Sequence, residues 1–414
     1  MEILYISSVP SPKEFDRIKG RFKDAFIYGM NESGFKFHTL IMNGMISRPD
    51  VHITSLVGRS VSHSSHRGLW WKRLREPVSQ QLVYDHIGFL NLPVVKHLMI
   101  GTGFFVRTLQ WLHRTKGQQR AIVMDAAYVT AHPFVLAARK FGKCHTTAIF
   151  CDIYDYMGDV KDARDAQQVS LGRRMLRNMA GRSYRQLDSF ILLTEQMTNV
   201  VNPLHKPYLV MEGLVDVNME SVPNELQNKT PYKTLMYAGA LRAQYGLKNL
   251  VEGFQAYENP EARLWIFGAG DYAEEIEKAA RQDPRITFGG MIPLHEAVAK
   301  ELEADLLVNC RPTDMEFAQY SFPSKNMEYM ASGTPVLTTR LPGMPQEYYQ
   351  YVYTIDGNRP EDATDAIRRA MEYSKEELYE KGKKSRNFVL SQKNNITQSG
   401  RILQLVGYHT EQEV

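Results

Sequence analysis

The residues best suited to chemistry lie in one short stretch, residues 320–336, with the sequence YSFPSKNMEYMASGTPV. Ser324 is expected to cap a helix whose first turn carries Lys325, and Glu328 follows on the same face. A helix N-terminus beside an ammonium group attracts phosphate, and a carboxylate can accept hydrogen bonds from vicinal hydroxyls such as those of ribose. The pattern outlines a cradle for a nucleoside diphosphate. The plainer alternative is a capped surface helix with a Lys–Glu pair worth roughly 0.3 to 0.5 kcal/mol.

A glycine-containing turn precedes this stretch at 237–250, with the sequence YAGALRAQYGLKNL. Gly239 and Arg242 lie between an expected strand and a helix that starts near Gly246. Such a turn exposes backbone N–H groups to an anion such as phosphate. A purely structural strand-to-helix turn has the same appearance, so both interpretations stay open at this point.

A second turn, IFGAGDYAEEIEKAA at 266–280, carries Gly268 and Gly270. A dinucleotide fingerprint would need a third small residue, for which Ala273 is a tolerated substitute. However, the preceding strand is not the first of its domain, and the helix opens with acidic residues that would repel a pyrophosphate. We interpret this turn as strand-to-helix architecture.

The elements that must position these residues follow from short apolar runs that alternate with amphipathic stretches, as in the βαβ units of parallel sheets. First-half strands are expected at EILYISS, RAIVMDA, TTAIFCD, SFILLTE and YLVMEG, with helices at 131–142 and 170–186. Second-half strands are expected at KTLMYAG, ARLWIFGAG, RITFGG, ADLLVNC and PVLTTR, with helices at 246–257, 271–282, 294–303 and 324–332. A chain of 414 residues exceeds one ordinary core. Two doubly wound domains are predicted, with substrate in a cleft between them.

The composition, with 43% hydrophobic and 23% charged residues, favours a soluble globular protein. Three cysteines without metal-finger or redox-pair spacing argue against a disulfide scaffold and favour the cytoplasm. The N-terminus is interpreted as a first strand and not as a signal peptide. The apolar region 87–106 is interrupted by Pro93, Lys96 and His97, so no membrane span is expected there.

The net charge of +4 hides an asymmetry, because residues 1–200 carry 27 Lys and Arg against 16 Asp and Glu, whereas the remainder carries 23 against 30. Trp70 and Trp71 lie among basic residues in HRGLWWKRLREP at 66–77. One interpretation is peripheral contact with anionic lipid on the inner face of the cell membrane. The other is a solvated loop with one buried tryptophan. No nucleic-acid partner is expected, since no recognition module accompanies the charge.

The second half resembles the nucleotide-binding domain of retaining GT-B glycosyltransferases of family 4. The resemblance rests on YAGALRAQYGLKNLVEGF, LWIFGAGDY, ITFGGMIP, ADLLVNCRP and FPSKNMEYMASGTPVLTTRLPGMPQEY. The segment SFPSKNMEYMASGTPV is the most specific and is typical of the bacterial polysaccharide-assembly branch. In the first half, LLTEQM and YLVMEGLVD are similar to segments that end the N-terminal domain in this group.

This resemblance implies an α/β fold of GT-B architecture, with two doubly wound Rossmann-like domains facing across a cleft. The acceptor-side domain is expected at 1–216 and the nucleotide-sugar domain at 217–386. The remaining residues, 387–414, are expected to form a C-terminal helix that returns to the first domain.

Carried onto this sequence, the resemblance assigns the donor ribose to Glu328. Tyr320 replaces the family's first glutamate, and Ala240 and Tyr245 replace cations that usually hold the diphosphate. The catalytic residues expected in their place are Lys325 first, then Arg311, together with Glu328. The donor-binding set is Gly239, Arg242, Gly268, Tyr320, Ser321, Phe322, Pro323, Ser324, Lys325 and Glu328.

On the acceptor side, Ser7 and Ser8 stand where the family has a glycine-rich loop. Asp125 and Asp152 end expected strands, where each either meets the acceptor or caps a helix. The implied reaction transfers a sugar, with retention, from a nucleoside diphosphate sugar to a hydroxyl of a glycan or lipid-linked glycan. A UDP-sugar is the favoured donor. No cofactor is implied, and because the sequence contains no Asp-x-Asp triplet, activity without a metal is expected.

Two alternatives to a transferase stay open. A nucleotide-sugar epimerase would use the same donor site and need no acceptor. A noncatalytic GT-B subunit would bind a partner transferase or a glycan, and the replacements at Ala240, Tyr245 and Tyr320 favour this second alternative.

Overall fold

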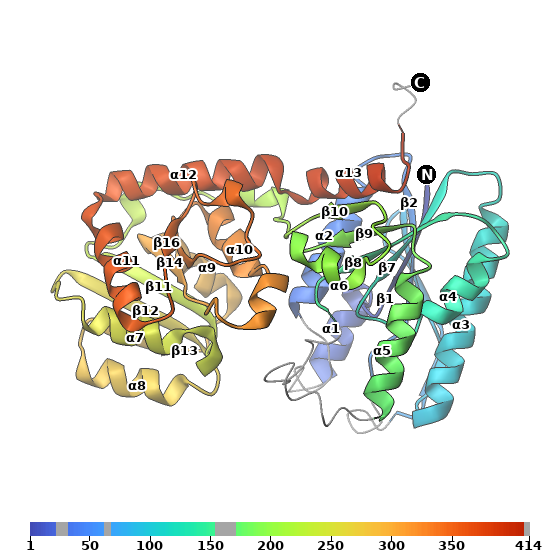
Figure 1. Ribbon diagram of the computed structural model, residues 1–414, viewed down its shortest axis with the longest axis horizontal. Coiled ribbons are helices and arrows are strands. Elements are labelled where there is room, and N and C mark those ends of the chain that lie inside the picture. The colour runs from blue at the N-terminus through green and yellow to red at the C-terminus, as the bar shows by residue number, and fades with distance from the viewer. Residues whose placement is uncertain (22–31, 62–67, 154–170, 410–414) are drawn as a thin grey trace. The chain divides into compact units, whose positions relative to one another are not determined.

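The structure is a computed structural model that describes residues 1–21, 32–61, 68–153 and 171–409. The chain divides into two compact units, here called unit 1 (Met1–Met211 with Asn395–Val414) and unit 2 (Glu212–Asn394) (Figure 1). The chain passes between the units after Met211 and after Asn394, whereas the expected boundaries follow residues 216 and 386. His66 and Arg67, at the start of the basic tryptophan-bearing segment, lie outside the described residues.

Unit 1 is built on an eight-stranded sheet in the order β10-β9-β8-β7-β1-β2-β5-β4. Its neighbouring strands are parallel except for β4, which runs antiparallel to β5. The strands are β1 (Glu2–Ser7), β2 (His52–Val57), β4 (Leu74–Pro77), β5 (Leu82–His86), β7 (Arg120–Asp125), β8 (His145–Phe150), β9 (Ser189–Leu192) and β10 (Tyr208–Val210). A separate antiparallel ribbon joins β3 (Trp70–Trp71) to β6 (Phe89–Leu90).

The described helices of unit 1 follow or connect these strands. They are α1 (Pro12–Arg21), α2 (Glu32–Met45), α3 (Pro93–Arg114), α4 (His132–Arg139), α5 (Leu171–Tyr184), the 3₁₀ helix η4 (Glu195–Met197), α6 (Thr198–Val201) and α13 (Asn395–Leu405). The five predicted first-half strands correspond to β1, β7, β8, β9 and β10. Sequence analysis did not find β2, β4 and β5, which extend the main sheet on its other side.

The C-terminal part of the chain differs from the expectation of one helix within 387–414. Instead, α12 (Lys375–Gln392) ends in unit 2, and α13 begins at Asn395 in unit 1. Helix α13 packs on α2, where Ser399 Oγ donates to the Ile41 carbonyl at 2.8 Å. A Cβ at Gly44 would lie 2.0 Å from the Asn395 carbonyl oxygen. Helix α13 therefore approaches α2 closely at its first residue, Asn395.

Unit 2 is built on a six-stranded sheet in the order β13-β12-β11-β14-β15-β16, and all neighbouring strands are parallel. The strands are β11 (Lys233–Ala240), β12 (Ala262–Ala269), β13 (Ile286–Gly290), β14 (Leu306–Asn309), β15 (Val336–Thr339) and β16 (Tyr353–Ile355). Numbered within the unit, this is the order 3-2-1-4-5-6, which reverses between β11 and β14. In open parallel sheets, ligands bind outside the carboxyl ends of the strands at such a reversal.

The described helices of unit 2 cover both faces of this sheet. They are α7 (Leu247–Gln255), α8 (Ala273–Gln282), α9 (Leu294–Glu303), α10 (Ser324–Ser332), α11 (Pro360–Glu372) and α12. Shorter 3₁₀ helices are η5 (Val217–Ser221), η6 (Leu226–Asn228), η7 (Ala243–Tyr245), η8 (Glu316–Tyr320) and η9 (Gln346–Tyr348). The predicted second-half helices correspond to α7, α8, α9 and α10.

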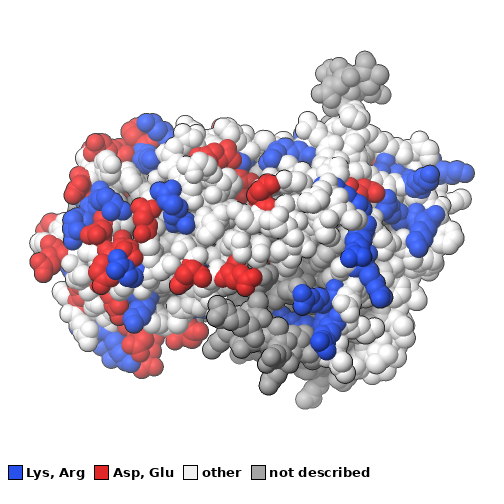
Figure 2. Space-filling view, viewed as in Figure 1, with Lys and Arg blue, Asp and Glu red and all other residues white. Residues whose placement is uncertain are grey.

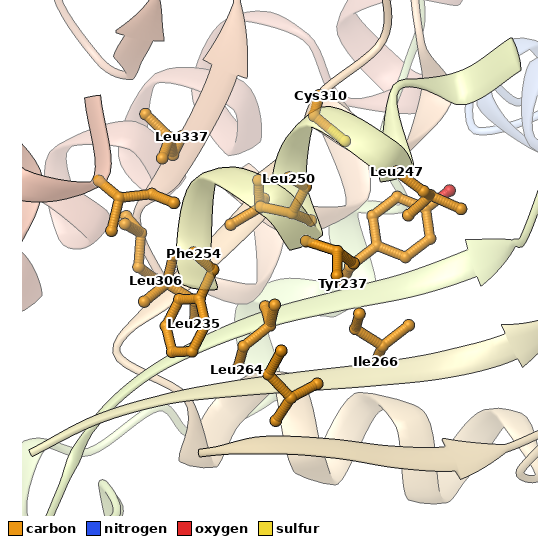
Figure 3. Packing of buried hydrophobic residues seen from close by; sticks show 14 of the residues in the cluster. Leu235, Tyr237, Leu247, Leu250, Phe254, Leu264, Ile266, Leu306, Cys310 and Leu337 are labelled. Carbon is orange, nitrogen blue, oxygen red and sulfur yellow. The ribbon is translucent and has the colours of Figure 1, made fainter. Parts of the chain in front are cut away.

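Alternating side chains of β11 supply the two cores of unit 2, as the period of a strand requires. Leu235 and Tyr237 pack in a cluster with residues of α7, α8 and α11, part of which Figure 3 shows around Leu250 and Phe254. Met236 and Ala238 pack on the other face in a cluster that contains residues of α10 and α12. Both faces of the sheet are thus buried. Polar and charged side chains that could bind a ligand are therefore expected at the strand ends.

The charge asymmetry of the sequence follows the two units. Unit 1 carries 29 Lys and Arg against 18 Asp and Glu, and unit 2 carries 21 against 28. On the face shown in Figure 2, acidic side chains are frequent over unit 2, whereas basic side chains predominate over unit 1. Within the described ranges, none of the helices combines the length and apolar character needed to cross a bilayer.

Candidate functional site

The candidate site lies at the carboxyl ends of β11 and β14, where the strand order of unit 2 reverses. Strand β11 ends in Gly239 and Ala240, and β14 is followed by Cys310 and Arg311. The N-termini of α7 and α10 follow in sequence from these strand ends through short 3₁₀ turns. The fold therefore brings three segments to one edge of the sheet: the end of β11 with the start of α7, the end of β14, and the start of α10.

Helix α10 is fixed to this edge by buried polar side chains. The Tyr329 hydroxyl accepts from the Ala238 amide and donates to the Ala238 carbonyl, both at 3.0 Å. Asn309 Nδ2 donates to Asn326 Oδ1 at 2.7 Å, and Asn326 Nδ2 donates to Thr338 Oγ1 at 3.2 Å. Buried polar groups that are satisfied in this way hold one arrangement. Helix α10 is thus tied to β11, β14 and β15.

Lys325 and Glu328 project from the first turns of α10, and each is partly exposed. Lys325 Nζ lies 3.9 Å from Glu328 Oε2. The stem of Lys325 passes over the end of β11, because a Cβ at Gly239 would lie 2.8 Å from Lys325 Cε. Lys325 Nζ also lies 5.6 Å from the Tyr329 ring centroid. The structure therefore brings Gly239, Lys325 and Glu328 together, as the sequence predicted.

The predicted capping role of Ser324 is wrong. Pro323 occupies the N-cap position of α10 with no side-chain hydrogen bond, and Ser324 is the first helical residue. Helix α7 likewise starts after Gly246 without a side-chain cap. At both helix N-termini, no capping side chain accepts a hydrogen bond from the first backbone N–H groups. Such N–H groups can bind an anion.

Arg311 is held by contacts with two different segments. Its NH1 donates to Ser321 Oγ at 2.8 Å, and its guanidinium carbon lies 4.9 Å from the centroid of the Tyr245 ring. Its backbone carbonyl accepts from Thr339 Oγ1 at 2.5 Å. These contacts fix a partly exposed cation between the start of α7 and the loop before α10.

Two glycines allow the loops at this edge to approach one another. Gly246 has φ +77°, and a Cβ there would lie 2.0 Å from the Cys310 carbonyl oxygen. Gly268 has φ +141° and pairs in register with Gly239, whose carbonyl oxygen would lie 1.8 Å from a Cβ at position 268. Gly268 thus shapes the edge through packing, and Gly270 likewise leaves room for the Leu241 backbone.

The other predicted donor-site residues differ in their burial and their contacts. Ser321 contacts Arg311, and Tyr320 is partly exposed at the end of η8. Phe322 packs on Tyr348 with ring centroids 5.2 Å apart, and its side chain belongs to the core. Pro323 is also buried, and Arg242 is exposed before η7.

In unit 1, the predicted acceptor residues are not equivalent. The buried Ser7 hydroxyl accepts from the Val9 amide at 3.2 Å, and Ser8 is partly exposed. Asp125 is buried, and its Oδ1 accepts from the Ala127 amide at 2.9 Å. Asp125 thus stabilises the turn before α4. Asp152 follows β8 and is exposed.

Sequence analysis missed a buried pair of polar side chains beside Asp125. The Tyr5 hydroxyl lies 2.6 Å from His38 Nδ1, and His38 Nε2 lies 3.7 Å from Asp125 Oδ2. Burial lowers the pKa of His38 below its ordinary value, although Asp125 opposes this effect. We interpret the buried Tyr5, His38 and Asp125 side chains as a structural polar network between α2 and the strands β1 and β7.

The missed residues carried little sequence signal. Tyr329 and Asn326 occur in the stretch 320–336, but only their position on the buried face of α10 distinguishes them from surface polar residues.

Within the described ranges, no group of three or more His, Cys, Asp or Glu side chains lies close enough together to bind a metal ion.

Comparison with known proteins identifies the fold. A family model described as glycosyl transferases group 1 matches residues 218–386, all within unit 2. Among curated protein sequences, none matches the chain. A sucrose-phosphate synthase from Thermosynechococcus elongatus is similar in structure with a TM-score of 0.61 at 14% identity, and the likeness covers 98% of each chain.

Two further structures are similar over almost their whole length. The lipopolysaccharide outer core galactosyltransferase WaaB, in its apo form, has a TM-score of 0.60 at 13% identity, covering 98% of this chain and 99% of that chain. Anabaena Alr3699/HepE, solved in complex with UDP and glucose, has a TM-score of 0.58 at 13% identity, covering 98% of each chain. These likenesses confirm the predicted α/β fold of GT-B architecture.

Proposed function

We propose that the protein is a glycosyltransferase that moves a sugar from a nucleoside diphosphate sugar, with a UDP-sugar as the favoured donor, to a hydroxyl group. The match of unit 2 to glycosyl transferases group 1 supports this class of reaction. The complex of HepE with UDP and glucose supports the choice of donor.

The observation that carries the proposal is the gathering of two cations, one carboxylate and two helix N-termini where the strand order of unit 2 reverses. Lys325 and the start of α10 would hold the diphosphate, together with Arg311 and the start of α7. Glu328 would accept hydrogen bonds from the ribose hydroxyls. Tyr320 and the backbone of Phe322 and Pro323 would line the side of the sugar.

The chemistry follows from where charge develops. When the glycosidic bond to the diphosphate breaks, negative charge grows on the leaving phosphate. Fixed cations and helix N-termini stabilise this charge more in the transition state than in the ground state. Arg311 suits this role because Tyr245 and Ser321 already hold its guanidinium group in place.

We further propose a retaining, metal-independent reaction of the family 4 type. In a front-face reaction, the acceptor hydroxyl adds to the face from which the diphosphate leaves, and the leaving phosphate takes the acceptor proton. No protein base is then required. Lys325 and Arg311 supply the positive charge that a bound metal supplies in other transferases.

The acceptor class proposed is a glycan or lipid-linked glycan in polysaccharide or glycoconjugate synthesis, in the cytoplasm. The likeness to a lipopolysaccharide galactosyltransferase supports this choice. In unit 1, the exposed Asp152 and the partly exposed Ser8 are the predicted residues available to an acceptor, since Ser7 and Asp125 are buried.

A panel of nucleotide sugars tests the proposal. The protein is incubated with each donor in the presence of EDTA, and slow release of nucleoside diphosphate is followed. One donor hydrolysed well above the others, with a loss in Lys325→Ala, is the expected result. Binding of UDP without turnover of any donor would favour a noncatalytic subunit. Conversion of the nucleotide sugar into an isomer would favour an epimerase.

A further inference from the structure

A second surface, on unit 1, has no part in the donor site. Exposed apolar side chains gather where the β3–β6 ribbon meets the start of α3. Trp70 is 58% exposed, Val94 72% and Leu98 59%. We call this surface the apolar edge, and its residues are Leu69, Trp70, Leu92, Val94, Val95 and Leu98.

Backbone hydrogen bonds hold the β3–β6 ribbon next to the start of α3. Trp70 pairs with Leu90 in the ribbon, and the Asn91 amide donates to the Leu69 carbonyl at 2.7 Å. The Leu92 amide then donates to the Leu90 carbonyl at 2.8 Å, directly before α3 begins. Residues separated by more than twenty positions in the sequence are therefore neighbours on one surface.

The fold does not need these side chains for its core. On the ribbon, Trp71 is the buried tryptophan, stacked on Phe89 with ring centroids 5.9 Å apart. Trp70 points to the opposite side, because successive side chains of a strand alternate. Helix α3 buries Phe104 and Trp111 in its later turns. A group of large exposed apolar side chains in one region of a surface is typical of an interaction site.

The charge around the apolar edge is positive. Lys72 and Arg75 are exposed, and within the described part of the chain neither has a hydrogen bond or ion pair to a side chain. Arg73 differs, since its Nε donates to Asp85 Oδ1 at 2.7 Å. Between Asp85 and Asp125 the sequence contains no acidic residue.

We propose that the apolar edge docks unit 1 on an anionic lipid surface. Trp70, Val94 and Leu98 would enter the headgroup layer, where tryptophan and aliphatic side chains are favoured, while Lys72 and Arg75 meet the lipid phosphates. The absence of acidic residues from 86–124 favours a continuous negative surface over a protein partner with charges of both signs. This proposal is independent of the donor-site proposal.

The structure changes which residues of the basic segment matter. Sequence analysis placed lipid contact around Trp70 and Trp71 as one of two interpretations. The structure buries Trp71, pairs Arg73 with Asp85, and adds the start of α3. Val94 and Leu98 of α3 would therefore contribute to binding, which the basic segment at 66–77 alone does not predict.

Sedimentation of the full-length protein with vesicles tests the proposal. Vesicles of equal parts phosphatidylglycerol and phosphatidylcholine are compared with vesicles of phosphatidylcholine alone, at low and high salt. The protein is expected to bind the anionic vesicles and to be released as salt rises, because salt screens the attraction. Lys72→Glu with Arg75→Glu should lower the partition by at least about tenfold. Trp70→Ser, Val94→Ser and Leu98→Ser together should lower it by a similar factor.

Matched controls keep the test specific. Lys116→Glu with Lys140→Glu changes exposed charges of unit 1 outside the apolar edge, beyond the far end of α3, and should leave the partition unchanged. Thermal unfolding and UDP binding of each variant should match the unmodified protein. Three outcomes would each overturn the proposal: no binding to anionic vesicles, equal losses in the control variant, or binding that no change at the apolar edge reduces. A loss seen only with Arg174→Glu and Met175→Ser on α5, which also exposes apolar and basic side chains, would likewise overturn it.

Discussion

At the scale of single residues, two neighbouring side chains hold the Arg311 guanidinium in the proposed donor site. Tyr245 contributes its ring, 4.9 Å from the guanidinium carbon, and Ser321 accepts a hydrogen bond at 2.8 Å. Such a ring restricts the cation without neutralising it. We therefore propose Tyr245 as a positioning residue for Arg311. The contribution of its ring can be tested separately from that of its hydroxyl.

Replacing Tyr245 tests this role. Tyr245→Ala removes the ring and should weaken UDP binding by roughly 0.5 to 1 kcal/mol, the usual strength of an exposed cation–π contact. Tyr245→Phe keeps the ring and should bind UDP as the unmodified protein does. Titration calorimetry measures both. Equal losses in the two variants would assign the effect to the hydroxyl and contradict the positioning role.

Lys325 and Glu328 were predicted as neighbours because their spacing on one helix is local. Gly239 lies far from them in the sequence, and the family resemblance assigned its turn to the same donor site. The capping role of Ser324 was wrong because Pro323, with its fixed φ, takes the N-cap position and leaves Ser324 inside the helix. Tyr329 and Asn326 were missed because their partners are backbone and side chains of distant strands. The partner of Tyr329, Ala238, is 91 residues away.

At the scale of elements, the close pairing of β11 with β12 depends on Gly268. Gly268→Ala would place a Cβ 1.8 Å from the Gly239 carbonyl oxygen and adds strain at φ +141°. The variant should lose at least about 2 kcal/mol of unfolding free energy. Gly290→Ala on β13 is the matched control, since φ there is +62° and no atom lies within 4 Å of its Cβ.

The Gly290→Ala control should lose only about 1 to 2 kcal/mol of unfolding free energy, which is the cost of the left-handed backbone conformation alone. Denaturant unfolding measures both variants. If Gly268→Ala is no less stable than Gly290→Ala, the close approach of the two strand ends does not hold in solution.

The segment before β11 is anchored to the end of α9 by a partly buried cation, Lys229. Lys229 Nζ donates to the carbonyls of Leu302 and Ala304, each at 2.8 Å, and to Thr334 Oγ1 at 3.0 Å. Burial lowers the pKa of Lys229 to about 8, although the Asp305 carboxylate opposes this effect. The folded state therefore binds this proton less tightly than the unfolded state.

The sign of the pH dependence follows. The cost of burying charged Lys229 is fully present below about pH 8 and is relieved as pH rises toward the ordinary pKa of lysine. Between pH 8 and 10, the unfolding free energy of the protein relative to Lys229→Met should rise by roughly 1 to 3 kcal/mol. Denaturant unfolding at several pH values checks this. A difference that stays flat or falls over this range would contradict the assigned pKa.

Elements differed in how well the sequence predicted them. Strand β7 contains the continuous apolar run AIVM, and β8 ends in the apolar run AIF. These runs are strong signals because both faces of the sheet are covered. Strand β2 was missed because its core positions include the buried polar residue Ser55. The break between α12 and α13 was missed because tertiary contacts determine it. The Val215 amide donates to the Lys393 carbonyl at 3.0 Å, and Lys393 Nζ contacts the Glu212 carboxylate at 2.5 Å.

At the scale of the whole molecule, the C-terminal residues belong to unit 1 although they follow unit 2 in the sequence. Ile402 and Leu403 of α13 are fully buried. A chain that ends at Asn394 should lose roughly 3 to 6 kcal/mol of unit 1 stability, which lowers the melting temperature of unit 1 by on the order of 10 °C. Unit 2 should unfold as before and still bind UDP.

A chain that ends at His409 retains α13 and serves as the control. Calorimetric unfolding with and without UDP distinguishes the two units, because a ligand raises the melting temperature only of the unit that binds it. If the chain ending at Asn394 unfolds like the control, α13 is not part of the unit 1 core. If UDP stabilises only unit 1, the donor site has been placed in the wrong unit.

The proposed nucleoside diphosphate site in unit 2 is tested by calorimetric binding of two ligands, UDP and uridine. Each is titrated into the unmodified protein, Glu328→Ala and Lys325→Ala. Glu328→Ala should weaken both ligands by on the order of 1.5 to 3 kcal/mol, the range for hydrogen bonds to a charged group. Lys325→Ala should weaken UDP by a similar amount and uridine little. Glu277→Ala, on the exposed side of α8, should change neither. Unchanged UDP affinity in folded Glu328→Ala, or equal losses of UDP and uridine affinity in Lys325→Ala, would show that the nucleoside diphosphate does not bind at these residues.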